Sequence, residues 1–296
     1  MKVTHLPDAS PRPRRVAVGT FDGVHLGHRE VIAGADTVLT FDPHPQSVVA
    51  PGSAPRLLTT IERKAELVAG LGVEELVIIP FDGAFAARSA QDFVDHVLVE
   101  TLQATHVSVG ENFRFGHKAK GDVEMLRADE RFETRVVRLL EFHDEVVSSS
   151  HIRGLLTAGD VEEAGRLLGE PFQLRGEVVH GDKRGRTLGF PTANLIPDAR
   201  YVTPGHGVYA ARALLVGPDP ELVLPAAVNI GVRPQFVTGR GELIEAYLLD
   251  FEGDIYGQML RIDFLQRLRG EKRFDSVEAL VEQMGRDVDQ ARAIAD

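Results

Sequence analysis

The stretch VGTFDGVHLGH, residues 18–28, decides how the first half of the chain is interpreted, because an apolar run passes directly into a turn with repeated glycines. Two histidines, His25 and His28, flank Leu26 and Gly27 in this turn. A helix beginning near His28 would aim both imidazoles and its positive dipole end at one site, and Gly27 permits close approach of the backbone. The stretch therefore predicts a site that stabilises charge on a phosphoryl group.

Two other interpretations of the histidine pair stay open on these residues alone. The two side chains could be a surface feature or could cap the end of a helix. They could also bind zinc, although no third ligand at a suitable spacing is evident.

The composition restricts the class of protein. A chain of 296 residues, 43% apolar and 26% charged, is typical of a globular protein with two domains. The absence of cysteine excludes disulfides, thiolate nucleophiles and cysteine-based zinc sites. A net charge of −11 argues against a nucleic-acid surface, and no apolar run approaches the roughly 18 residues of a membrane helix. We therefore expect a cytoplasmic protein without nucleic-acid or membrane partners; its oligomeric state stays open, a weak homo-oligomer included.

The spacing of apolar residues predicts two different domains. The first half alternates β-branched runs with segments of helical spacing, which indicates an α/β domain with a parallel sheet. After Pro171, strands separated by Gly and Pro turns indicate an antiparallel barrel or sandwich, and an amphipathic helix closes the chain. We place the boundary near residue 170, with domains at 1–170 and 171–296. The expected strands of the first domain are RRVAVGT, DTVLTFD, ELVIIPFD and HVSVGENF.

Polar segments follow several of these strands. In a parallel sheet, ligands bind outside the carboxyl ends of the strands. Histidine, asparagine, hydroxyl and arginine side chains would gather at that edge, beside helix N-termini that attract phosphate. The segments are GTFDGVHLGH, TFDPHP, PFD, GENFRFG and, later, SSSHIR.

A second motif, GDKRGRTLGFPTANL, lies at residues 181–195. Its glycines would let a loop backbone wrap phosphates, and its basic residues would offset their charge. Thr192 and Asn194 offer oxygen ligands suited to Mg²⁺. Taken alone, the motif is equally compatible with a plain glycine-rich hairpin. The residues concerned are Gly181, Gly185 and Gly189, with Lys183, Arg184 and Arg186.

In their order, GTFDGVHLGH, TFDPHP, GENFRFG and SSSHIR resemble the adenylyltransferase module of the bacterial bifunctional riboflavin kinase and FAD synthetase family. This module belongs to the Rossmann-like HxGH nucleotidyltransferases, and the resemblance spans most of residues 14–170. It implies that His25 and His28 bind ATP phosphates and stabilise the α-phosphoryl transition state as FMN attacks. It also implies ATP contacts at Gly19, Phe21, Asn112, Ser149, Ser150 and Arg153, and flavin contacts at Phe41, Asp42, Pro43 and His44.

The chain departs from the family in two places. Ser150 stands where the family usually has Thr, which keeps the hydroxyl. Between His28 and Phe41 only REVIAGADTVLT remains, where the family has a full-length helix. A helix of about eight residues spans roughly 12 Å, less than the roughly 16 Å of a five-residue strand. We therefore expect a truncated first helix, and a weakened or lost adenylyl site stays open.

The second domain resembles the riboflavin kinase module, a six-stranded antiparallel barrel. GFPTAN, GVYA, NIGVRP and IEAYLLDFEGDIYG occur in the order found in riboflavin kinases, and the resemblance covers nearly all of residues 172–296. It implies that Thr192 and Asn194 engage Mg²⁺ and ATP phosphates, and that Glu245 is the catalytic base. A carboxylate suits this role, because the riboflavin 5′-hydroxyl must lose its proton during transfer. If the PTAN motif is left out of account, Glu245 is interpreted as an outward-facing residue on a strand whose apolar and polar residues alternate.

The resulting hypothesis is a two-step enzyme. The barrel would phosphorylate riboflavin with ATP and Mg²⁺, and the N-terminal domain would adenylylate FMN with ATP, producing FAD and pyrophosphate. One alternative is a monofunctional riboflavin kinase whose N-terminal domain is degenerate. Another is a flavin-responsive binding or regulatory protein without turnover.

Overall fold

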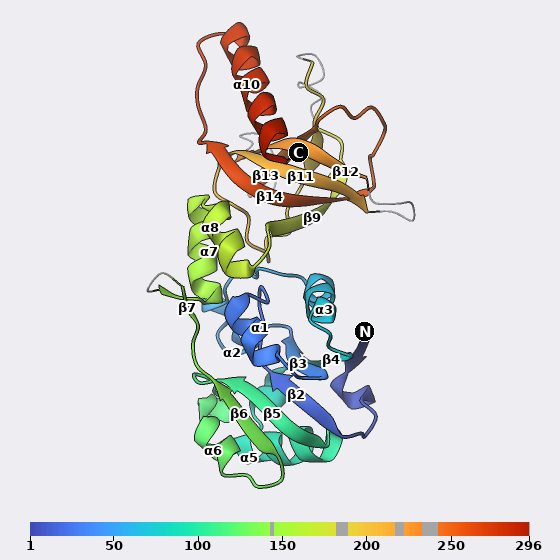
Figure 1. The fold of residues 1–296 in the computed structure, drawn as a ribbon, viewed down its shortest axis with the longest axis vertical. Coiled ribbons are helices and arrows are strands. Elements are labelled where there is room, and N and C mark those ends of the chain that lie inside the picture. Colours follow the sequence, from blue (N-terminus) through green and yellow to red (C-terminus); the bar gives the residue numbers. More distant parts are fainter. Residues whose placement is uncertain (143–144, 182–188, 217–221, 233–241, 296) are drawn as a thin grey trace. The chain divides into compact units, whose positions relative to one another are not determined.

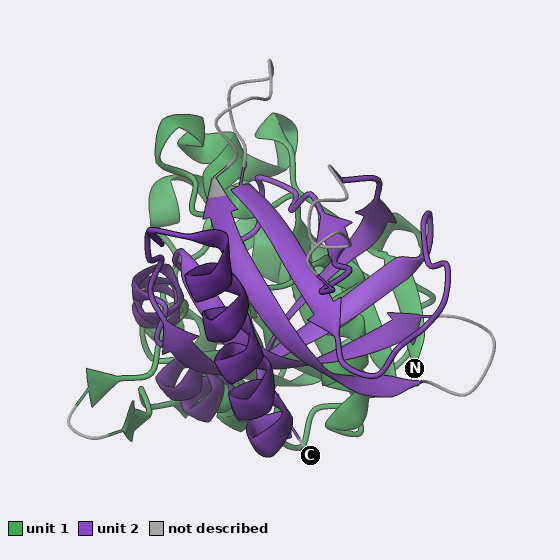
Figure 2. Ribbon diagram, turned by 90° about the horizontal axis from the view of Figure 1, so that it is seen from above, with its two compact units in different colours: residues 1–149 green, residues 150–296 purple. Residues whose placement is uncertain are grey.

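A computed structural model of the chain describes residues 1–142, 145–181, 189–216, 222–232 and 242–295 (Figure 1). The chain divides into two compact units, Met1–Ser149 and Ser150–Asp296, coloured separately in Figure 2. This division lies about 20 residues before the predicted boundary near residue 170, at the start of two helices that end before that boundary. The functional boundary near residue 170 stays a prediction. No helix in the described ranges is both long enough and apolar enough to cross a membrane.

The N-terminal unit is built on a six-stranded sheet in which every neighbouring pair is parallel. The chain adds strands toward one edge and then returns to add strands on the other side of β2. The direction of winding therefore switches between β2 and β5, and a parallel sheet binds ligands at such a switch point. In spatial order the strands are β1 (Lys2–His5), β4 (Glu75–Pro80), β3 (Thr37–Asp42), β2 (Arg14–Val18), β5 (Ala104–Gly110) and β6 (Glu133–Val137).

Four of these strands were predicted, because they are apolar runs buried on both faces. Val16 and Val18 of β2 belong to one apolar cluster, whereas Ala17 between them belongs to another. This alternation is the expected result of helices covering both sheet faces. The edge strands β1 and β6 were not predicted, because most of their residues are exposed or only partly buried and give no apolar run.

Short helices and turns connect the strands of this unit. The helices are α1 (Leu26–Ile32), α2 (Pro45–Val49), α3 (Ile61–Gly70), α4 (Gly83–Ala86), α5 (Ala90–Asp92), the π-helical η3 (Phe93–Thr101) and α6 (Val123–Arg127). Single 3₁₀ turns are η1 (Leu6–Asp8), η2 (Pro51–Ser53) and η4 (His117–Ala119), and a small hairpin pairs β7 (Glu141–Phe142) with β8 (Glu145–Val146).

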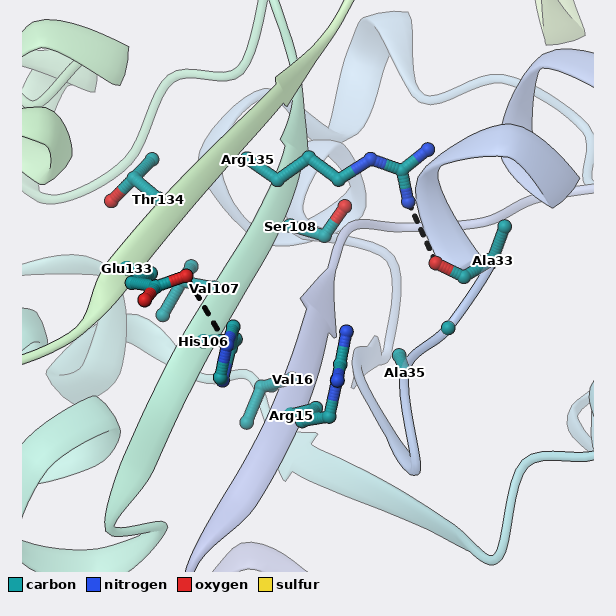
Figure 3. Close-up of a pocket in the computed structure, with 11 residues that line it drawn as sticks. Arg15, Val16, Ala33, Ala35, His106, Val107, Ser108, Glu133, Thr134 and Arg135 are labelled. Atoms are coloured by element: carbon teal, nitrogen blue, oxygen red, sulfur yellow. Dashed lines mark hydrogen bonds and ion pairs between the residues drawn. The ribbon is translucent and has the colours of Figure 1, made fainter.

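The truncated first helix is confirmed. Helix α1 has seven residues, and the chain turns toward β3 at Gly34, whose φ is +80°. Arg135 Nη1 donates to Ala33 O at 2.7 Å, placing a cation at the carboxyl end of α1, where it stabilises the helix. Beyond this short helix, a hollow of about 260 Å³ lies over β2, β5 and β6 (Figure 3). The shortening therefore affects the end of α1 that is remote from the histidines.

The second unit contains a closed antiparallel barrel, as the family resemblance predicted, and the sandwich alternative is wrong. The PTAN motif runs into a short strand, β10, which closes the barrel between β9 and β13. In spatial order the strands are β10 (Ala193–Leu195), β13 (Glu242–Leu248), β12 (Val223–Val232), β11 (Gly207–Val216), β14 (Met259–Arg269) and β9 (Phe172–Val179).

Within the described residues, three helices accompany the barrel strands. Helices α7 (Ser149–Ala158) and α8 (Val161–Leu168) precede the barrel, and α10 (Val277–Ala295) packs against β11, β12 and β14. Asp287 of α10 is 4% exposed and accepts from the Arg269 guanidinium of β14 at 2.8–3.1 Å. This partly buried ion pair connects the last helix to the barrel.

Candidate active sites

The loop after β2 holds a strained conformation through buried hydrogen bonds. Phe21 and Val24 have φ values of 47° and 43°, a region that bulky and β-branched residues rarely adopt. Between them, Asp22 is 2% exposed, and its carboxylate accepts from the main-chain nitrogens of Leu58 at 2.9 Å and Thr59 at 3.2 Å. Strain of this kind is typical of a functional loop whose surroundings determine its shape.

The structure brings His25 and His28 together. Their rings stack with centroids 3.6 Å apart, and the Phe21 ring meets His28 edge-on at 5.4 Å. The helix begins at Leu26 rather than near His28, because His25 Nδ1 accepts from His28 N at 3.3 Å and so caps the helix. A Cβ on Gly27 would lie 3.4 Å from the His25 ring, which is an ordinary van der Waals contact, so packing against that imidazole does not itself require glycine.

The capping interpretation of His25 is thus correct, and it is compatible with a phosphate site, because a capped N-terminus still presents its positive dipole end. The zinc interpretation gains no support: within the described ranges, no three His, Cys, Asp or Glu side chains are placed to hold a metal ion.

Of the other predicted ATP residues, Gly19 and Ser149 make hydrogen bonds at this loop. Gly19 N donates to Leu39 O of β3 at 3.1 Å, and a Cβ on Gly19 would lie 3.0 Å from the Phe21 ring. Asn112 follows β5, the strand that pairs with β2 at the switch point. Ser149 Oγ donates to the main-chain oxygen of Asp22 at 2.9 Å.

Ser150 and Arg153 lie further along α7, the helix that begins at Ser149.

The four predicted flavin residues lie at the carboxyl end of β3, next to β2 in the sheet. Phe41 is partly buried and contacts the Phe81 ring edge-on at 5.7 Å. Asp42 and Pro43 are exposed and joined by a cis peptide bond. His44 caps α2, since its Nδ1 accepts from Gln46 N at 3.2 Å.

Sequence analysis missed Lys64, which lies on α3 and is 6% exposed. Its Nζ donates to Thr20 O at 2.6 Å and Thr40 Oγ1 at 3.2 Å. Burial lowers the pKa of Lys64 to about 8, against the opposing effect of the Asp22 and Asp42 carboxylates.

The sequence does contain a signal that could have identified Lys64, namely its position in the helical pattern. Lys64 occupies an apolar position of the helical pattern that runs through Ile61, Ala65 and Val68.

In the barrel, strand register places Glu245 between two amides. Glu245 of β13 lies directly opposite Asn194 of β10 on one side and Asn229 of β12 on the other. Directly opposed residues share one face of a sheet, so the three form a row. Asn229 Nδ2 donates to Glu245 Oε2 at 3.3 Å. Asn229 was quoted within NIGVRP, but no role was assigned to it.

Glu245 does alternate with core residues, as the outward interpretation supposed: Ile244 and Ala246 are buried, whereas Glu245 is partly exposed. Its face is nevertheless lined by amide side chains from both neighbouring strands. The carboxylate is therefore held at a polar site.

Among the predicted ATP and metal residues of the barrel, Thr192 and Asn194 lie at the start of β10. Asn194 is 5% exposed, and its Nδ2 donates to Thr192 O at 3.2 Å. Gly181 packs against this amide so closely that a Cβ there would lie 2.6 Å from Asn194 Cγ. Gly189 has a φ of +85°, and a Cβ there would meet nothing within 4 Å.

Part of the predicted phosphate loop lies outside the described residues, namely Lys183, Arg184, Gly185 and Arg186.

Comparison with known proteins identifies both halves of the chain. The family model for FAD synthetase matches residues 8–151, and that for riboflavin kinase matches residues 168–295. A bifunctional riboflavin kinase/FMN adenylyltransferase from Listeria monocytogenes is 40% identical over 291 residues, which cover 94% of this chain and 91% of the relative. Proteins of the same name from Bacillus subtilis and Escherichia coli K12 are each 38% identical, covering 93% and 94% of this chain and 90% and 91% of their own lengths.

A solved structure from Streptococcus pneumoniae, described as a macrolide-efflux protein, superimposes with a TM-score of 0.89. It is 30% identical and covers 99% of both chains. With both family models matched in order, and with relatives that align over nearly the whole length, this chain belongs to the bifunctional riboflavin kinase/FMN adenylyltransferase family.

Proposed function

We propose that this chain makes FAD from riboflavin in two ATP-dependent steps. The barrel transfers the γ-phosphoryl of ATP to the riboflavin 5′-hydroxyl, which produces FMN and ADP. The N-terminal domain then transfers the AMP group of a second ATP to the FMN phosphate, which releases pyrophosphate. The observation that carries this proposal is the match of both modules, in order, along one chain.

In the kinase step, Glu245 accepts the proton of the 5′-hydroxyl as the γ-phosphoryl arrives. The hydrogen bond from Asn229 orients the carboxylate toward the shared face of β10, β12 and β13. Thr192 and Asn194 provide neutral oxygen donors, which fit Mg²⁺ because this ion is bound mainly through phosphates and water. When bound, Mg²⁺ would offset the charge of the triphosphate. Among the described residues of the phosphate loop, Gly181 and Gly189 would let the backbone approach the ATP phosphates closely. Gly185 keeps its predicted ATP contact and lies outside the described residues.

In the adenylyl step, His25 and His28 contact the ATP phosphates and stabilise the charge that develops on the α-phosphoryl group. An FMN phosphate oxygen attacks the α-phosphorus, and the bond to pyrophosphate breaks. No covalent enzyme intermediate is needed, because positioning and electrostatics supply most of the catalysis in phosphoryl transfer. The remaining ATP contacts are Gly19, Phe21, Asn112, Ser149, Ser150 and Arg153, and the flavin contacts are Phe41, Asp42, Pro43 and His44.

The short helix α1 is compatible with an active adenylyl site. The histidines occupy its first turn and N-cap, and the shortening falls at the other end, beyond Ile32. The hollow in Figure 3 lies against Ala33 and Gly34 rather than against the histidine loop. The alternative of a monofunctional kinase is therefore not favoured.

The proposal assigns adenylyl transfer to residues 1–170 and the kinase to residues 171–296. It takes the partners to be small molecules, namely riboflavin, FMN and ATP with Mg²⁺, and it places the reactions in the cytoplasm.

Product analysis tests this function directly. The purified chain is incubated with Mg-ATP and either riboflavin or FMN, and the flavins are separated by chromatography. We expect FMN and FAD from riboflavin, and FAD with pyrophosphate from FMN. FMN without FAD would leave only the monofunctional kinase, and binding without any product would leave a flavin-responsive regulatory protein.

A further inference from the structure

Lys64 connects the ends of two neighbouring strands. Its ammonium group donates to Thr20 O at 2.6 Å and to Thr40 Oγ1 at 3.2 Å. The Thr40 hydroxyl in turn donates to Thr20 O at 3.0 Å, so the three groups form a closed set of hydrogen bonds. Thr20 follows β2 and Thr40 lies in β3, so Lys64 spans both strands from its position on α3.

These two strand ends carry the two halves of the proposed adenylyl site. Thr20 directly precedes Phe21 in the loop that leads to the histidines, and Thr40 directly precedes Phe41 and Asp42 of the flavin segment. The distance between the two segments determines how far the FMN phosphate lies from the α-phosphorus of ATP. A displacement of about 1 Å can lower such a transfer rate by about 10²-fold.

A lysine at this position is unfavourable for folding alone. Its side chain lies on the apolar face of α3 beside Val68, which is fully buried. Burying a charge is unfavourable unless the charge is well paired, and a well-packed apolar residue there would often be neutral or stabilising. The presence of a cation therefore points to a role in the reaction.

We propose that Lys64 is a positioning residue for adenylyl transfer, which sets the spacing between the ATP-binding loop after β2 and the FMN-binding end of β3. The inference rests on the proposed adenylyltransferase function. The charge of Lys64 has a second effect at the same place, because it offsets the Asp22 and Asp42 carboxylates at a site that must admit anionic phosphates.

The protonated form of Lys64 offsets the two carboxylates and donates both hydrogen bonds as a charged, stronger donor. The carboxylates that act on it are Asp22, from the loop, and Asp42, from the end of β3. On α3 itself, Arg63 pairs with Glu66 at 3.0 Å. Since burial lowers the pKa of Lys64 to about 8, we expect the adenylyl rate to fall as the pH rises through 8 to 9. Deprotonation of Lys64 is not expected to lower the kinase activity of the same molecules.

As the pH rises, the stability of the fold should change in the opposite direction to the adenylyl rate. This difference separates a positioning role from a merely structural one. Because the folded pKa of Lys64 lies below the unfolded value of 10.5, the buried ammonium reduces stability at neutral pH. This penalty disappears as the pH rises from about 8 to 10.5. Over the same range, the adenylyl rate should fall.

The experiment compares Lys64→Met and Lys64→Arg with the parent chain, and uses Lys2→Met as the matched control. Lys2 lies in the same unit on the edge strand β1; its side chain is 60% exposed, and its ion pair with Glu75 is long, at 3.7 Å. FAD formation from FMN and FMN formation from riboflavin are both measured from pH 6.5 to 9.5, with thermal unfolding alongside.

We expect Lys64→Met to lower kcat for FAD formation by about 10²-fold at pH 7, with smaller changes in KM and unchanged kinase activity. Lys64→Arg should restore part of kcat and move the alkaline decline to higher pH, because arginine keeps its charge. Lys2→Met should behave as the parent chain.

Parental kcat and an unchanged alkaline decline in Lys64→Met would overturn the proposal. If Lys64→Met fails to fold, Lys64→Arg provides the test. The proposal would equally be overturned if the adenylyl rate of Lys64→Arg declined at the same alkaline pH as that of the parent chain. Failure of the proposed function is distinguishable, because the parent chain itself would then make no FAD from FMN at any pH.

Discussion

The two candidate active sites are built in different ways. In the N-terminal unit, the site consists of loops that follow β2, β3 and β5, and buried side chains such as Asp22 and Lys64 hold those loops. In the barrel, three adjacent strands place Asn194, Glu245 and Asn229 in one row through main-chain pairing alone. A site on loops thus depends on supporting side chains, whereas a site on a strand ladder takes its geometry from the register.

This difference predicts where each site is vulnerable. The left-handed φ values of Phe21 and Val24 are unfavourable by about 1–3 kcal/mol each, and surrounding contacts must offset them. In the barrel, a shift of register by one residue would turn the whole row to the other face, and the closed sheet prevents such a shift. We therefore expect supporting residues to matter more in the N-terminal unit, and the following variants test this from the largest expected effect to the smallest.

Glu245→Gln should have the largest effect. Glutamine keeps the shape of the side chain but cannot accept the hydroxyl proton, so the rate of FMN formation should fall by about 10²–10⁴-fold. FAD formation from added FMN should remain at the parental level, which controls for folding. A variant that phosphorylates riboflavin at the parental rate would show that Glu245 is not the base.

His28→Asn is the reciprocal test in the other unit. Loss of the imidazole that stacks on His25 should lower FAD formation by about 10²–10³-fold, through lost stabilisation of the α-phosphoryl group. Riboflavin phosphorylation should be unaffected in the same preparation. If both rates fell together, the separation of the two sites would be wrong.

Asp22→Asn tests support of the loop at a distance from the reacting atoms. The carboxylate accepts from Leu58 N and Thr59 N, and hydrogen bonds to a charged group contribute about 1.5–3 kcal/mol. We expect FAD formation to fall by about 10- to 100-fold, as measured by steady-state kinetics on FMN. Kinase activity again serves as the internal control.

Asn229→Ala is the equivalent supporting change in the barrel and should have the smallest effect. It removes the 3.3 Å hydrogen bond to Glu245, but the register continues to hold the carboxylate on its face. FMN formation should fall by about tenfold or less. The comparison between the two units would be contradicted if Asn229→Ala lowered FMN formation by a larger factor than Asp22→Asn lowers FAD formation.

The accuracy of the sequence predictions depended on the range of the interactions involved. The limits of α8 follow from local signals: Asp160 caps its start by accepting from Glu163 N at 3.0 Å, and Gly169 ends it with a φ of +79°. The short α1 could be predicted from the few residues between its histidines and the next strand. By contrast, no strand was predicted at the end of the GDKRGRTLGFPTANL motif, because a strand of three residues has too little periodicity to be recognised.

The candidate site residues divide in the same way. The histidines and the PTAN motif carry local signatures, whereas Lys64 and Asn229 were missed because their partners lie far away in the sequence.

By itself, the sequence determined the two domain types, the helix caps and the spacing of the histidine pair, because periodicity and short-range hydrogen bonds encode them. Only the tertiary structure decided that Lys64 reaches Thr20 and that Asn229 lies opposite Glu245. Those contacts arise from the packing of a helix against the sheet and from the register of paired strands, and neither leaves a periodic trace along the chain.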